Sequence, residues 1–177
     1  MRLGKAIKGS SVHLELFLES DVSEKYLGWL SDYAINRFLE TRFIQLDADS
    51  AKRYIEQCQE SPDVLFLKIV TDAKEFIGTC TVFYNQFHRT AKIGLMIGEK
   101  SFQNRGIGSE VISLLKEFCC ADLGVRKITA GLYSSNIGSM RAFLKNEFFL
   151  ESTLKLQVLL DDEPEDVYQL AYFCSKY

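Results

Sequence analysis

The chain has 177 residues, of which 47% are hydrophobic and 25% charged. This is enough material for one compact α/β domain and too little for two, so we expect residues 1–177 to form a single domain. The formal net charge is −3, and the 21 Lys and Arg residues are scattered, which argues against a general nucleic-acid binder because phosphate-backbone affinity needs clustered cations.

No stretch approaches the roughly 20 apolar residues of a membrane span. Residues 1–11 lack the uninterrupted apolar segment of a secretory signal. We therefore expect a cytoplasmic protein without a membrane partner, whose partners are small molecules or other proteins.

Cysteine and histidine usage predicts neither disulfides nor a metal site. The five cysteines form no Cys-x-x-Cys pair, and an odd number fits no closed disulfide framework. We expect all of them to be reduced, mostly buried apolar side chains: Cys58, Cys80, Cys119, Cys120 and Cys174. The two histidines, His13 and His88, have no second ligand type at metal spacing, so we expect no bound metal.

The first part of the chain predicts one strand and three helices. Residues 12–17 alternate between apolar and polar side chains, which is typical of a strand. Asp21 is a suitable N-cap for a first helix, and Asp32 for a second short one. Asp49 or Ser50 is expected to begin the third helix.

The remainder predicts most of a sheet. Apolar runs bounded by turn residues predict six further strands, at residues 64–71, 76–84, 91–97, 127–132, 148–160 and 167–173. A helix with an apolar face follows Gly108 and ends before Gly124, a short helix spans about 138–145, and the acidic run Asp161–Asp166 joins the last two strands. The order predicts an α/β (α+β) fold: a mixed, largely antiparallel central sheet of about seven strands flanked by helices.

The most informative motif is the run Gln103-Asn104-Arg105-Gly106-Ile107-Gly108, between a strand and an amphipathic helix. Its glycines let consecutive N–H groups point at one anion, and the helix dipole adds to the attraction. A P-loop is excluded because Ser109-Glu110 stands where Lys-Ser/Thr is required, and a dinucleotide fingerprint is excluded because position 111 is Val. The run predicts a phosphate-binding loop that needs no metal.

With this loop and element order, the chain resembles the GNAT superfamily of acetyl-CoA-dependent N-acetyltransferases. Gln103, Gly106 and Gly108 match the signature Gln/Arg-x-x-Gly-x-Gly/Ala. Glu110 and the later pair Asn136 and Ser139, an Asn-x-x-Ser motif, are similar to the RimJ/RimL branch. The resemblance covers residues 12–173.

The resemblance implies a GNAT-like fold with acetyl-CoA as co-substrate. The backbone of Met96, Ile97 and Gly98 is then expected to hydrogen-bond the pantetheine arm as an added strand would. The pyrophosphate is expected on the loop and the first helical turn: Gln103, Asn104, Arg105, Gly106, Ile107, Gly108 and Ser109. Asn136 lies where the family contacts the cofactor arm, although a plain N-cap explains this residue equally well.

Two positions depart from the family pattern. Many members carry a Tyr, thought to protonate the leaving thiolate, where this chain has Phe143. A phenyl ring donates no proton, so the acid role passes to Ser139 or to water. The family's Lys-x-Gly-Phe is here Lys145-Asn146-Glu147-Phe148, and we expect Asn146 to take the left-handed conformation of the missing glycine.

The implied reaction is direct attack by a neutral amine on the thioester in a ternary complex. At pH 7, removing a proton from a lysine ammonium costs about 4.6 kcal/mol, and from an α-ammonium about 1 kcal/mol. We therefore expect a low-pKa acceptor, either a nucleotide-linked amino sugar or a protein N-terminus. Glu99 and Glu110 are candidate bases, although a loop charge and a helix first-turn acid explain them better.

Substrate binding is expected at aromatic and basic positions. Trp29, Arg37 and Arg42 come from a segment suited to stacking on sugars or pairing with phosphates, although Trp29 also fits the core face of a helix. His88 lies in a hairpin and is a further candidate, because histidine is the side-chain type that most often transfers protons at neutral pH.

Three possibilities stay open. Because Phe143 replaces the usual Tyr, the chain is alternatively a non-catalytic acyl-CoA-binding or sensing module. An acyl group larger than acetyl is a further possibility. A homodimer formed through the late strands is also compatible with the sequence.

Overall fold

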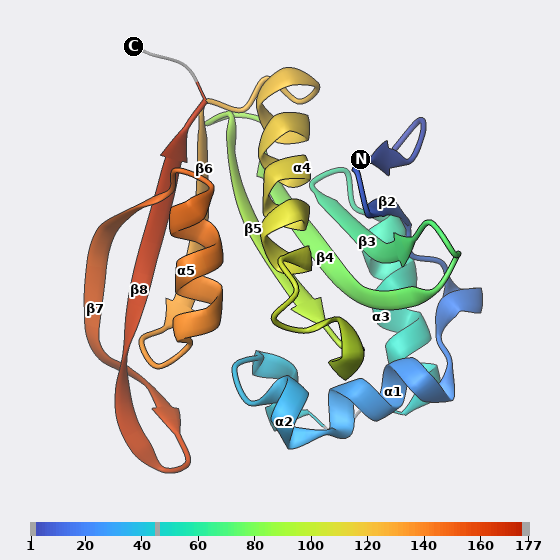
Figure 1. The fold of residues 1–177 in the computed structure, drawn as a ribbon, viewed down its shortest axis with the longest axis horizontal. Coiled ribbons are helices and arrows are strands. Elements are labelled where there is room, and N and C mark those ends of the chain that lie inside the picture. Colours follow the sequence, from blue (N-terminus) through green and yellow to red (C-terminus); the bar gives the residue numbers. More distant parts are fainter. Residues whose placement is uncertain (1–2, 45–46, 175–177) are drawn as a thin grey trace.

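The structure is a computed structural model that describes residues 3–44 and 47–174. Its strands form one eight-stranded sheet with the order β1-β2-β3-β4-β5-β6-β8-β7 (Figure 1). The strands are β1 (Ile7–Lys8), β2 (Val12–Leu16), β3 (Val64–Thr71), β4 (Phe76–Asn85), β5 (Thr90–Ile97), β6 (Lys127–Tyr133), β7 (Phe149–Leu160) and β8 (Glu163–Phe173). Neighbours pair antiparallel except β5 and β6, which pair parallel. The predicted fold class is confirmed, and the strand missed from the sequence is the two-residue β1.

The helices cover both faces of this sheet (Figure 1). Helix α4 lies in front of the sheet with α5 beside it, α3 lies behind, and α1 and α2 lie along one end. The helices are α1 (Glu24–Ser31), α2 (Tyr33–Asn36), α3 (Ala48–Glu60), α4 (Ile107–Ala121) and α5 (Ile137–Lys145), with short 3-10 turns η1 (Glu19–Asp21), η2 (Glu40–Phe43) and η3 (Lys100–Phe102).

Two predicted helix starts are wrong and one is confirmed. Helix α1 begins after Ser23, whose side chain accepts a hydrogen bond from the Tyr26 amide, whereas Asp21 accepts from the Leu18 amide inside the preceding 3-10 turn. Helix α3 begins after Asp47, because Asp47 and Ser50 cap each other reciprocally. Asp32 caps α2 as predicted.

The late hairpin is longer than the sequence indicates. The acidic run was expected to be a loop, but strand pairing resumes at Glu163, opposite Leu160. Only Asp161 and Asp162 form the turn, with φ values of 55° and 64°. A two-residue turn with both residues at positive φ matches the twist of a hairpin, and Asp tolerates that conformation.

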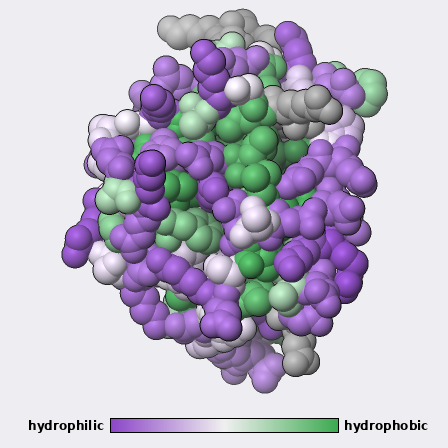
Figure 2. Space-filling model, turned by 90° about the vertical axis from the view of Figure 1, so that its right-hand side faces the viewer, coloured by the Kyte–Doolittle hydropathy of each residue, from purple (hydrophilic) through white to green (hydrophobic). Residues whose placement is uncertain are grey.

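Apolar side chains pack on both faces of the sheet. Between the sheet and α4 the core includes Leu67, Ile93 and Leu115. A second cluster on the α1 and α3 side includes Phe17 and Ile55. Figure 2, seen from the right-hand side of Figure 1, shows apolar side chains in a band down the middle of this face with hydrophilic ones on both sides.

One disulfide contradicts the expectation that all cysteines are reduced. Cys120 at the end of α4 is bonded to Cys174 just after β8, although 54 positions separate them. No sequence spacing signals this bond, because the fold brings the end of α4 beside the end of the last strand. Cys58, Cys80 and Cys119 are free and buried, as predicted.

Candidate active site

The sheet divides between β5 and β6. These strands pair only over Thr90–Lys92 and Lys127–Thr129, so from Ile93 onward β5 has no strand partner on this side. A cleft of about 580 Å³ opens at the division. Of the sequence-predicted residues, it is lined by Met96, Ile97, Gln103, Asn104, Gly106, Gly108, Ser109, Asn136 and Ser139. We call this the first cleft.

The glycine loop follows β5 closely. The Gln103 side chain donates a hydrogen bond from Nε2 to the carbonyl oxygen of Ile97 at 2.8 Å, which ties the loop to the strand end. Asn104 and Gly106 both have positive φ, 59° and 85°. No side chain caps α4, whose N-cap is Gly106. The first-turn N–H groups of this helix are therefore left for an outside acceptor.

The glycines of this region serve different purposes. A Cβ on Gly106 would meet no atom within 4 Å, so its positive φ, not lack of space, requires glycine there. A Cβ on Gly98 would lie 2.1 Å from the Trp29 ring. Gly98 also donates its N–H to the Ile77 carbonyl. The ring and this hydrogen bond hold Gly98 within the fold.

Helix α5 forms the other side of the first cleft. Asn136 accepts a hydrogen bond from the Ser139 amide at 3.2 Å and is thus the N-cap, the alternative that the sequence left open. Phe143 is buried, with 1% of its surface exposed. Arg141 and Lys145 also line the cleft. Sequence reasoning missed these two cations, although their i, i+4 spacing places them on one helix face.

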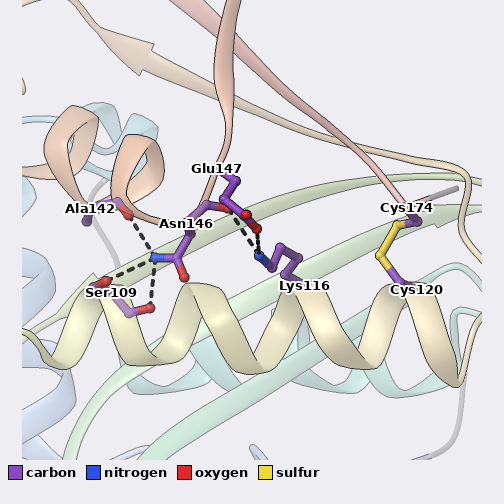
Figure 3. A network of polar contacts seen from close by, with 7 residues as sticks. All are labelled: Ser109, Lys116, Cys120, Ala142, Asn146, Glu147 and Cys174. Atoms are coloured by element: carbon purple, nitrogen blue, oxygen red, sulfur yellow. Dashed lines mark hydrogen bonds and ion pairs between the residues drawn. A yellow bond between two sulfur atoms is a disulfide. The ribbon is translucent and has the colours of Figure 1, made fainter. Parts of the chain in front are cut away.

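The end of α5 corrects the prediction for Asn146. Its φ is −94°, and Glu147 takes the left-handed conformation with φ of 68°. Figure 3 shows the Asn146 side chain pointing into the gap between α5 and α4. Its Nδ2 donates to the Ser109 carbonyl and hydroxyl, both at 3.0 Å, and to the Ala142 carbonyl at 2.8 Å. These contacts keep Asn146 right-handed and fix α5 against the first turn of α4.

A second cleft of about 720 Å³ lies beside the first, between η2 and the late hairpin. It contains three carboxylates, Glu40, Asp161 and Asp162, and the guanidinium of Arg42. Tyr133, at the end of β6, lines both clefts. Its hydroxyl donates to Glu40 Oε1 at 2.8 Å and accepts from Arg42 Nη2 at 3.0 Å.

Comparison with known proteins decides the family. Residues 12–148 match the model of the acetyltransferase (GNAT) domain. The chain belongs to the GNAT family. It is an acetyl-CoA-dependent N-acetyltransferase, and the enzyme predicted from the sequence is confirmed.

Relatives support the same family over most of the chain. The acetyltransferase is 27% identical to the probable N-acetyltransferase YjcK of Bacillus subtilis, over 93% of this chain and 95% of that protein. The fold matches spermidine N-acetyltransferase from Vibrio cholerae in complex with CoA and spermine, with TM-score 0.82, 15% identity and coverage of 92% and 95%. It also matches RimL, a ribosomal α-N-protein acetyltransferase in complex with coenzyme A, with TM-score 0.83, 18% identity and coverage of 96% and 98%.

The predicted substrate residues of the acetyltransferase do not gather in one place. Arg42 lines the second cleft. Trp29 is buried against Phe76 at 4.9 Å, in the core position that the sequence left open. His88 precedes β5. It lines a separate cavity with Thr90 and Arg126 and neither of the two clefts.

Arg37 does not line either cleft. Its guanidinium lies over the Phe38 ring at 4.8 Å, and its Nε is buried without a hydrogen-bond partner. Its carbonyl oxygen accepts a hydrogen bond from Arg42. Arg37 therefore supports the cleft residue Arg42 from behind.

Two further predictions concern carboxylates. A hydrogen bond from Lys25 lowers the pKa of Glu99. Burial raises the pKa of Glu110, but hydrogen bonds from Ser11 and Ser10 outweigh that effect and lower it. Glu110 Oε1 accepts from both backbone amides, at 2.7 and 2.8 Å. Both carboxylates have structural partners that the sequence did not indicate: Lys25 for Glu99, and the Ser10 and Ser11 amides for Glu110.

Within residues 3–44 and 47–174, every helix is too short or too polar to span a membrane. No three His, Cys, Asp or Glu side chains in those ranges gather closely enough to hold a metal ion.

Proposed function

We propose that acetyl-CoA binds in the first cleft with its pantetheine arm along β5 and its pyrophosphate on the first turn of α4. The unpaired edge of β5 beyond Lys92 supports the first half of this proposal. The uncapped α4 start at Gly106 supports the second. Arg141 and Lys145 add positive charge at the rim, and no metal is needed to hold the phosphates.

The acceptor is a low-pKa amine that enters through the second cleft and attacks the thioester directly in a ternary complex. The single observation that carries this proposal is that the two clefts meet at Tyr133. Ser139 lies in the first cleft, where its hydroxyl would hydrogen-bond the coenzyme sulfur, while Asn136 contacts the cofactor arm.

Between the two low-pKa acceptors, the charge of the second cleft favours the α-amine of a protein N-terminus. Glu40, Asp161 and Asp162 attract an ammonium group and repel a diphosphate. Nucleotide-linked amino sugars carry such a diphosphate. The acetyltransferase is therefore proposed to act on peptide N-termini, in the manner of the RimJ/RimL branch.

The test is calorimetric titration with acetyl-CoA, followed by thiol release in the same preparation. The acceptor panel contains peptides with free α-amines, the same peptides with blocked α-amines, a nucleotide-linked amino sugar and spermidine. Binding with turnover on the free peptides alone supports the proposal. Turnover on the sugar or spermidine alone contradicts the acceptor. Binding without any turnover supports the sensing module.

We further propose a homodimer formed through the edge strand β7. This strand exposes several large apolar side chains, among them Leu156 at 68% and Leu159 at 54%. Such an exposed edge is a natural pairing surface. Light scattering of the purified chain and of Leu156→Lys tests it: a dimer that becomes a monomer supports the interface, and a monomeric parent contradicts it.

A further inference from the structure

Tyr133 stands at the boundary between the two clefts. Among the described residues, it is the one that lines both the first and the second cleft. It comes from the last position of β6, where the strand has left β5 but is still paired with Val167 of β8. Its backbone is thus held by the sheet while its side chain lies between the two clefts.

Polar and aromatic contacts fix the side chain. The hydroxyl is placed between Glu40 Oε1 at 2.8 Å and Arg42 Nη2 at 3.0 Å. Arg42 is itself held, since Nη2 also donates to the Leu159 carbonyl at 2.7 Å. The ring packs 5.9 Å from that of Phe38, and only 6% of the residue is exposed. The hydroxyl proton points to Glu40 while Glu40 is a carboxylate. Once Glu40 is protonated it can donate to the Tyr133 oxygen instead, which frees the hydroxyl proton to turn toward the first cleft.

The surroundings keep the hydroxyl protonated until a base forms nearby. Burial raises the pKa of Tyr133, and the hydrogen bond to Glu40 raises it further. The charge of Arg42 acts in the opposite direction and would stabilise a tyrosinate once formed. Glu40 is exposed to the second cleft and to water, so it can exchange protons with an acceptor there.

We propose that Tyr133 is the general acid that protonates the leaving thiolate, and that Glu40 supplies its proton. This inference rests on the proposed function, because it assigns a proton route between the acyl donor and the amine. Phe143, at the family's usual acid position, has no proton to give. Ser139 then keeps the role of hydrogen-bonding the sulfur.

The proton route balances in three steps. Glu40 takes a proton from the acceptor ammonium, and the neutral amine attacks the thioester carbon. The C–S bond breaks, and the thiolate takes the proton of the Tyr133 hydroxyl. The tyrosinate regains a proton from the Glu40 carboxylic acid across their hydrogen bond, and the new amide nitrogen loses its second proton to water. The net products are the acetylated amine, CoA thiol and one proton.

The first test compares Tyr133→Phe with Tyr172→Phe. The first change removes only the hydroxyl and keeps the ring that packs on Phe38. Tyr172 packs against Phe148, away from both clefts, and serves as the matched control. With acetyl-CoA and the preferred free peptide, Tyr133→Phe should lower kcat by about 100-fold, while the control stays within about threefold. Calorimetric titration with CoA should give the same Kd for both variants and the parent.

The second test separates chemistry from structure. The selenoester analogue of acetyl-CoA releases a selenolate, which is a better leaving group and needs no protonation. With that donor the deficit of Tyr133→Phe should shrink to less than about tenfold. A deficit that is equal for both donors would mean that the hydroxyl acts only on structure, and would overturn the inference.

Failure of this inference can be distinguished from failure of the proposed function. If Tyr133→Phe keeps kcat within about threefold of the parent, the inference is wrong and the acetyltransferase activity stands. If the parent binds CoA but acetylates nothing in the panel, the proposed function has failed and the inference fails with it. Glu40→Gln should reproduce the Tyr133→Phe deficit with the thioester, because it removes the group that returns the proton.

Discussion

The first and second clefts of the candidate site differ in which parts of the chain form them. The first cleft is lined by the glycine loop and the adjoining ends of β5, α4 and α5, where the unpaired strand edge and the uncapped helix start are backbone features. The second cleft is made by side chains of η2, the end of β6 and the late hairpin, which are about 90 to 120 positions apart. Backbone geometry leaves a sequence signature because it requires glycine at particular places. Side-chain geometry leaves none, so the acceptor side has to be tested by substitution.

The Cys120–Cys174 bond links the end of α4 to the end of β8, and breaking it is the largest expected effect. Cys174→Ser should lower the free energy of unfolding by about 4 kcal/mol, the loop-entropy value for a separation of 54 residues. Urea unfolding of oxidised protein measures it. CoA affinity should not change, because the bond lies at the far end of α4 from the glycine loop. Cys58→Ala removes a free buried cysteine and keeps the disulfide, so its oxidised and reduced samples should differ by the same amount as those of the parent.

Backbone recognition in the first cleft is tested by Gly106→Val. A β-branched residue at φ of 85° must leave the left-handed region, which turns the α4 amides away from the anion. The CoA Kd should rise by about 100-fold, or roughly 3 kcal/mol. Calorimetry measures it on protein whose circular dichroism is unchanged. Gly28→Ala, an exposed helical position with open space around it, is the control and should bind CoA normally.

The junction between α4 and α5 is tested by Asn146→Ala. The substitution removes three side-chain hydrogen bonds and leaves the partly buried Ser109 carbonyl without this donor. Stability should fall by about 2 kcal/mol. CoA affinity should fall too, because Ser109 belongs to the first turn of α4. An unchanged Kd in the destabilised protein would show that the two helices hold their positions without this residue.

Side-chain recognition in the second cleft is tested by the double substitution Asp161→Asn and Asp162→Asn. Asn tolerates the positive φ of the turn, so charge changes while shape is kept. The KM for a free α-amine peptide should rise by about fivefold, close to 1 kcal/mol, with no change in CoA Kd. The control is Glu56→Gln, which removes an exposed charge on α3 and should change neither the peptide KM nor the CoA Kd.

The smallest effect concerns Glu147, the left-handed residue after α5. Glu147→Gly relieves a strained conformation, and the lost pair with Lys116 involves a largely exposed carboxylate of little value. Unfolding experiments should show a stabilisation of about 0.5 kcal/mol. A loss of stability would mean that the Lys116 pair matters more than the strain.

The sequence alone determined the features that depend on local geometry. Alternation, apolar periodicity and glycine positions predicted the sheet, most helices, the glycine loop between β5 and α4, and the family, because each needs particular residues at fixed spacing. Errors arose where several residues could serve equally: Ser23 in place of Asp21 at a helix start, and Glu147 in place of Asn146 after α5. Neighbours in space, such as Ser109 near Asn146, decided between them.

Only the tertiary structure decided which distant side chains meet. Cys120 reaches Cys174 because α4 ends beside β8, and Trp29 lies in the core because Gly98 leaves room for its ring. No sequence pattern links Tyr133 to Glu40 and Arg42. The three side chains meet where the two clefts join, because β6 has separated from β5 there. A local sequence pattern predicts the conformation of the backbone at that place. Contacts between side chains far apart in the sequence depend on how the whole sheet is assembled.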